Sequence, residues 1–136
     1  MKLLLLYADL FAYSPGQKSL EEAPEVTRGA EYRNAVVAFT HVEEQDRENE
    51  GKAVTKLIKN VKWLAGKFGT KNVVLHSFSH LSESKADPGF AAHVLELAGE
   101  RLEGVGYEVA ITPFGYVLHL TMSLPGVSLA RVFKSF

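Results

Sequence analysis

The strongest constraint on the fold is an amphipathic helix that lies between two apolar, β-branched runs. Within residues 52–68 the apolar side chains recur every three or four positions, and Gly69 follows where a helix would end. Residues 35–42 and 72–78, on either side, are typical of strands. We therefore expect a strand-helix-strand unit over residues 35–78, with a right-handed crossover if its strands share one sheet.

Other segments extend this unit. Residues 3–8 form an apolar run typical of a strand that is covered on both faces. Asp87 and Pro88 suit the start of a second helix, which runs to about residue 103. Residues 107–112 and 116–123 are expected to be strands joined by a hairpin-like connection, and residues 128–133 a terminal helical turn.

Residues 12–33 contain prolines, glycines and many charges, which predicts a flap or a partly ordered loop. The order of elements is otherwise mixed. We therefore predict a single α+β domain over residues 1–136, with a mixed β-sheet and two main helices.

Composition excludes several classes of function. The chain of 136 residues has no cysteine, so disulfides, thiolate nucleophiles and cysteine zinc sites are absent. Its net charge of -1 means that nucleic acid would bind through a local patch. The four leucines after Lys2 are too few for a membrane span, and we expect a buried strand there and a cytoplasmic protein with no membrane contact.

Two separate segments are the candidate functional site. His76-Ser77-Phe78-Ser79-His80-Leu81-Ser82 and Pro113-Phe114-Gly115-Tyr116 each follow a strand-like run, so both could rim one pocket. Serines, a glutamate and a lysine surround His80 in sequence, and a neutral imidazole there can move a proton near pH 7. Hydrogen bonding of His80 within its loop, without a catalytic role, is the simpler alternative.

The same residues argue against other chemistries. In an extended chain His76 and His80 lie roughly 13 Å apart, too far for one metal ion, so we predict no metal and no cofactor, and a structural or surface role for His76. No Gly-x-Ser-x-Gly elbow or phosphate-binding glycine loop is present.

Charge clusters leave one choice open. The acidic run over residues 43–48 is expected to be a solvated loop. The lysines at positions 52, 56, 59, 62 and 67 fit a solvated helix face and contact with phosphates equally well.

Four segments together resemble the N-terminal editing domain of archaeal-type threonyl-tRNA synthetase, which has a D-aminoacyl-tRNA deacylase-like fold. They are the opening run 3–9, the run 36–42, Phe78-Ser79-His80-Leu81-Ser82 and Pro113-Phe114-Gly115-Tyr116, in an order that covers nearly the whole chain. The resemblance implies an aminoacyl-tRNA deacylase that hydrolyses serine from mischarged threonine tRNA. Such hydrolysis is needed because one methyl group gives a binding pocket only about 1–3 kcal/mol of discrimination.

The resemblance also implies roles for residues. His80 would be catalytic, and the loop Ser77-Phe78-Ser79-His80 would contact the terminal adenosine and the aminoacyl group. Val42 would line the pocket, with Phe114, Gly115 and Tyr116 as its opposite wall. The partner would be the aminoacyl-tRNA 3′ end. The chain would be a free-standing homodimer that does not itself charge tRNA, and it would act beside a separate threonyl-tRNA synthetase.

Three positions depart from the family pattern. A second aromatic residue and a lysine that supports hydrolysis are expected after Tyr116, and Val117 and Leu118 stand there; a glutamate aligns with Arg131. One hypothesis is therefore a deacylase that relies on main-chain groups, His80 and the RNA's own 2′-hydroxyl. A second is a tRNA-end or small-molecule binding domain of the same fold whose hydrolysis is lost or changed. A third is an unrelated small-ester or amide hydrolase, or an interaction module.

Overall fold

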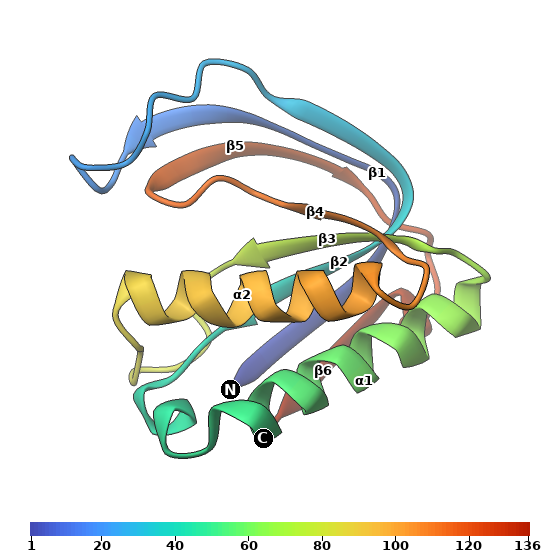
Figure 1. The fold of residues 1–136 in the computed structure, drawn as a ribbon. Coiled ribbons are helices and arrows are strands. Elements are labelled where there is room, and N and C mark those ends of the chain that lie inside the picture. Colours follow the sequence, from blue (N-terminus) through green and yellow to red (C-terminus); the bar gives the residue numbers. More distant parts are fainter.

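The computed structural model describes all residues 1–136 as one six-stranded mixed sheet with two helices on one face (Figure 1). The strand order is β4-β3-β2-β1-β5, and β6 pairs with the first part of β1. This architecture confirms the predicted α+β class. The strands are β1 (Lys2–Lys18), β2 (Ala30–His41), β3 (Asn72–Ser77), β4 (Glu108–Ile111), β5 (Tyr116–Ser123) and β6 (Arg131–Ser135); the α-helices are α1 (Glu50–Phe68) and α2 (Pro88–Glu103), and the short 3-10 helices are η1 (Glu44–Asn49) and η2 (Ser128–Ala130).

The predicted strand-helix-strand unit is confirmed as β2, α1 and β3. β2 and β3 are parallel neighbours in register from Ala35 opposite Asn72 onward. α1 ends at Gly69, whose φ of 63° is the left-handed conformation that glycine adopts at low cost. A second unit, β3-α2-β4, follows with β4 also parallel to β3. Three parallel strands therefore end at the same edge of the sheet.

The two strands predicted at residues 107–112 and 116–123 are present as β4 and β5, but the predicted hairpin pairing between them is wrong. β4 forms one edge of the sheet, whereas β5 pairs antiparallel with β1 at the opposite side. β4 is placed by its parallel pairing with β3, so the residues between β4 and β5 cross from one side of the sheet to the other. The helical turn predicted at residues 128–133 is correct only for residues 128–130, which form η2. Residues 131–133 belong to β6.

Residues 12–33 are not the loop that their composition predicts. β1 continues to Lys18 and β2 begins at Ala30, so the two strands form a long antiparallel pair with a connection of residues 19–29. The ladder between β1 and β5 is irregular between Pro15 and Lys18. A bulge there is physically consistent with Pro15, which lacks the N–H that a regular ladder needs.

Apolar residues pack on both faces of the sheet. Alternate residues such as Leu5 and Ala38 contact the two helices, while Leu6 and Val37 belong to a smaller cluster on the other face. That second face is sheltered because β1, β2 and β5 curve strongly (Figure 1). Neither helix is both long and apolar enough to span a membrane.

The acidic run over residues 43–48 is solvated as predicted at four positions, but Glu43 and Asp46 are buried. Residues from Glu44 onward form η1 instead of a loop. The Met1 ammonium group lies 2.8 Å from Glu43 Oε1 and 3.1 Å from Asp46 Oδ1. Buried carboxylates require such partners, and sequence periodicity does not reveal a partner more than 40 residues away.

Candidate functional site

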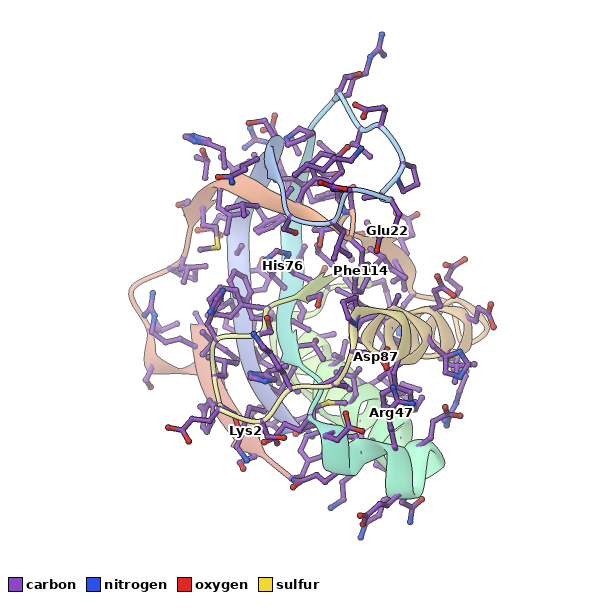
Figure 2. All side chains as sticks on the ribbon, turned by 90° about the vertical axis from the view of Figure 1, so that its left-hand side faces the viewer. Lys2, Glu22, Arg47, His76, Asp87 and Phe114 are labelled. Carbon is purple, nitrogen blue, oxygen red and sulfur yellow. The ribbon has the colours of Figure 1, made fainter.

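A cavity of about 480 Å³ opens where the three parallel strands end. Its wall comes from the ends of β2 and β3, the following loop, the start of α2, and the crossing that leads into β5. Figure 2 views this end of the molecule and shows Phe114 and His76 between the connection that carries Glu22 and the start of α2 at Asp87. Ligands commonly bind at the carboxyl ends of parallel strands, where loops from separate segments meet.

The structure brings all ten predicted site residues into the wall of this one cavity. Their functional roles stay predictions, but their proximity is a property of the fold. The residues are Val42, Ser77, Phe78, Ser79, His80, Phe114, Gly115, Tyr116, Val117 and Leu118.

The loop after β3 is held against the end of β2 by His41. This histidine is fully buried, and its Nδ1 accepts a hydrogen bond of 3.0 Å from the Leu81 N–H. A neutral ring that accepts at Nδ1 carries its proton on Nε2, so Nε2 donates to the Ser84 carbonyl oxygen at 2.7 Å. Both nitrogens of one side chain thus hold the loop that carries His80.

Other bonds complete this attachment. The Phe78 and Ala86 N–H groups donate to the Thr40 and Val42 carbonyl oxygens, at 3.0 Å each. The hydroxyl group of Ser82 donates to Glu43 Oε2 at 2.8 Å. The ends and the middle of the loop are therefore fixed.

Glu43 links the loop to the Met1 ammonium group. Burial alone would raise the pKa of Glu43, but hydrogen bonds from Met1, Ser82 and Lys2 lower this pKa to about 2. The carboxylate is therefore ionised at neutral pH and accepts bonds from both sides.

His76 also lines the cavity, although it was not among the predicted site residues. Its exposed fraction is 7%, its Nδ1 lies 2.8 Å from Thr112 Oγ1, and the Phe39 ring meets it edge-on at 4.7 Å. Burial lowers the pKa of His76 to about 4, so the ring is neutral at pH 7. His76 was predicted to be a structural or surface residue. It is buried, as a structural residue would be, but it also lines the cavity, which was not predicted.

The opposite wall depends on Gly115 and Tyr116. Gly115 has a φ of 85°, and a Cβ there would lie 2.5 Å from the Ala23 Cβ. The Tyr116 hydroxyl accepts from the Val26 N–H at 3.0 Å and donates to the Pro24 carbonyl oxygen at 2.8 Å. Tyr116 therefore fixes the connection between β1 and β2, and its hydroxyl is already bonded.

The ionised side chains in the cavity wall are of one sign, positive. Lys85 is the only lysine or arginine in the wall, and no carboxylate lines it. Lys85 and His80 are both exposed, and His80 meets the Phe78 ring edge-on at 5.1 Å. Lys85 was predicted only as a sequence neighbour of His80, because no local pattern indicates that the loop returns Lys85 to the cavity.

The three positions that depart from the family pattern are now placed. Val117 and Leu118 both lie in the cavity wall, whereas His119 is exposed and outside it. Arg131 also lies outside and donates to the Val127 carbonyl oxygen. The cavity therefore has an apolar side chain at the position where the resemblance predicts a lysine.

Two residues of the cavity wall have main-chain N–H groups that are not used within the protein. The N–H groups of Ser79 and His80 have no acceptor within the protein. They belong to the loop that His41 holds. Fixed N–H donors of this kind are suited to an oxyanion or to a ligand carbonyl group.

Comparisons with known proteins identify the family. The model of the "Archaea-specific editing domain of threonyl-tRNA synthetase" matches residues 1–136. The threonine–tRNA ligase of Hyperthermus butylicus is 30% identical over 142 residues, covering 100% of this chain and 23% of that protein. The corresponding ligase of Pyrococcus horikoshii is 30% identical over 138 residues, covering 99% of this chain and 22% of that protein. The chain thus spans less than a quarter of these relatives.

A solved structure shares the fold. The "c-Myc DNA Unwinding Element Binding Protein" superposes with a TM-score of 0.68 and 9% identity, covering 100% of this chain and 99% of that one. This likeness concerns the fold alone. Together with the match over residues 1–136, the observations show that the chain belongs to the family of archaea-specific editing domains of threonyl-tRNA synthetase.

Proposed function

We propose that the cavity binds the 3′ end of an aminoacyl-tRNA and hydrolyses its ester, with serine on threonine tRNA as the substrate. The observation that carries the proposal is the meeting of His80, free N–H donors and Lys85 in one cavity of a chain from this family. An aromatic wall from Phe78 and Phe114 offers surfaces for the terminal base.

The proposed reaction needs one water molecule and no redox partner. The water oxygen attacks the ester carbonyl carbon, and His80 takes a proton from this water. The N–H groups of Ser79 and His80 stabilise the oxyanion that forms. The bond from the carbonyl carbon to the ribose oxygen then breaks, the proton passes to that oxygen, and the free amino acid leaves.

Lys85 is assigned to the nucleic acid in this proposal. A lysine favours an anion, and the phosphate next to the terminal nucleoside is the anion that such a substrate carries. The absence of carboxylates from the wall fits a polyanionic ligand. The chain would act as a homodimer in the cytoplasm, beside a separate threonyl-tRNA synthetase.

One observation favours a second candidate function. Leu118, an apolar residue in the cavity wall, stands where the resemblance to the family predicts a lysine, so in this alternative the domain would bind the tRNA end without hydrolysing the ester. In this alternative the same wall residues act as a receptor. The two candidates differ in turnover and agree in binding.

The deciding experiment measures deacylation of Ser-tRNA(Thr), Thr-tRNA(Thr) and D-aminoacyl-tRNAs. We expect cleavage of Ser-tRNA(Thr) above spontaneous decay, and a loss of about 100-fold in His80→Ala with an unchanged melting temperature. Lys85→Gln should raise KM while Lys85→Arg retains it. Leu118→Lys should increase turnover if position 118 is the lysine position.

Two outcomes of this assay would contradict the proposed hydrolysis or the proposed role of His80. If tRNA binds but no substrate is cleaved faster than spontaneous decay, the deacylase proposal fails and the binding function stands. Unchanged turnover in His80→Ala removes that histidine from the mechanism.

A further inference from the structure

The exposed side of α1 carries a stripe of lysines around a tryptophan. Lys52, Lys56, Lys59, Trp63 and Lys67 follow at steps of four, three, four and four residues, which places them on one side of the helix. Trp63 is 40% exposed, while the opposite side of α1 is buried in the core. We define the basic surface as Lys52, Lys56, Lys59, Lys62, Trp63 and Lys67 of α1 with Lys134 of β6.

None of the six lysines of the basic surface has a carboxylate partner. The ion pairs of the molecule involve other cations, such as Lys2, Lys18 and Arg47. Lys134 Nζ instead lies 5.2 Å from the centroid of the Trp63 ring. Aromatic contacts of this kind orient an ammonium group without neutralising it.

A requirement for solubility does not explain this pattern. Lys52 with Lys56, Lys56 with Lys59, and Lys59 with Lys62 are like-charge neighbours at three or four residues, and such pairs destabilise a helix. A solvated helix gains more from alternating glutamate and lysine. The chain as a whole has a net charge of -1, and six of its 15 lysine and arginine residues lie on this surface.

The basic surface begins next to the cavity. η1 directly precedes α1, and its Arg47 pairs with Asp87, which caps α2 at the cavity wall. Figure 1 shows α1 and α2 starting at the same side of the molecule. From Lys52 the stripe then runs for about 22 Å, at 1.5 Å per residue over 15 residues.

We propose that the basic surface binds the phosphate backbone of the double-stranded RNA stem behind the bound 3′ end. This inference rests on the proposed function, since the RNA whose end enters the cavity presents its stem outside. A-form RNA is recognised largely through its backbone and shape, for which unpaired lysines on a rigid helix are suited. The surface therefore supplies affinity, and the cavity selects the aminoacyl group.

The test uses an RNA hairpin that reproduces an acceptor stem but lacks the single-stranded 3′ end and any ester. Fluorescence anisotropy gives its Kd between 50 and 200 mM salt for wild type, for Lys52→Gln/Lys59→Gln/Lys62→Gln, and for a control with the same loss of charge. The control is Arg28→Gln/Arg33→Gln/Lys71→Gln, whose sites lie outside α1 and β6.

We expect the plot of log K against log salt, where K is the association constant, to be less steep by about 2 in the α1 variant, because each phosphate contact contributes about 0.7–0.9 to the steepness. The control should stay near wild type. Equal slopes in the two variants, an unchanged slope in the α1 variant, or preferential binding of an acidic protein would overturn the proposal.

The outcome is separable from that of the deacylation assay. The hairpin carries no ester, so it reports on the basic surface whether or not the cavity hydrolyses anything. Circular dichroism checks folding: removal of like-charge pairs should leave the melting temperature of the α1 variant equal to or above that of wild type.

Discussion

Replacing His41 tests whether the loop that carries His80 is positioned by one buried side chain. In His41→Phe a ring still fills the fully buried site, but it neither accepts from the Leu81 N–H nor donates to the Ser84 carbonyl oxygen. The other bonds of the loop, from Phe78, Ala86 and Ser82, remain. The loop should therefore loosen around Leu81 and Ser84 while its ends stay in place.

The expected loss of stability follows from these two bonds. Each contributes about 1 kcal/mol net, so the free energy of unfolding should fall by about 2 kcal/mol. Leu81 is half-buried and Ser84 exposed, so water can reach the freed groups and limit the cost. Urea unfolding measures this change, and His93→Phe, at a half-exposed surface site, is the control.

A readout at the loop separates positioning from simple packing. Hydrogen exchange of the Leu81 amide should accelerate in His41→Phe. In His41→Asn an oxygen near the Nδ1 position retains an acceptor, so protection of Leu81 should largely return. We also expect kcat to fall more than KM changes, since the free N–H donors of Ser79 and His80 lose their fixed positions.

Two results would contradict a positioning role of His41. If His41→Phe loses stability but the Leu81 amide exchanges as slowly as in wild type, His41 only fills space. Equal protection of Leu81 in the Phe and Asn variants would likewise show that the Nδ1 acceptor is not what holds the loop.

The remaining predictions concern pH and the far wall. Because the pKa of His76 is lowered to about 4 in the fold, the unfolded chain binds that proton more tightly, so stability is complete above pH 6.5 and falls towards pH 4. The pKa of Glu43 is lowered to about 2, so its contribution is present above pH 4.5 and is lost as the pH falls towards 2. Urea unfolding across pH checks both, and a profile that stays flat from pH 6.5 to 4 contradicts the first. Gly115→Ala should cost about 1–3 kcal/mol in a thermal melt because of its φ of 85° and the close contact at its Cβ, whereas Gly126→Ala, with open space around it, should be neutral. Equal melting of these two variants would show that the wall adapts. Tyr116→Phe should accelerate exchange of the Val26 amide, and unchanged exchange would mean that the hydroxyl does not hold the connection.

Local patterns in the sequence determined the helices and caps that are stabilised by contacts between residues close in sequence. The helical period over residues 52–68, the Asp87 cap and Gly69 act within a few residues, and each was read correctly. The two segments around His80 and Phe114 could also be predicted as a pocket rim, because each ends a strand. Their shared cavity follows from the parallel pairing of β4 with β3, which was not predicted because residues 107–112 were expected to pair with residues 116–123.

Tertiary structure alone decided which distant residues meet. Residues 12–18 and 30–33 became strand because partners more than 10 residues away complete their ladders, and β5 joined β1 instead of β4. The roles of His41 and Glu43 depend on Leu81, Ser84 and the Met1 ammonium group, which lie about 40 residues away. No sequence period encodes such pairs, since hydrogen bonds and ion pairs form between any groups that the fold brings within reach. The sequence by itself therefore determined the elements and the rim of the cavity, and the tertiary structure decided how that rim is held.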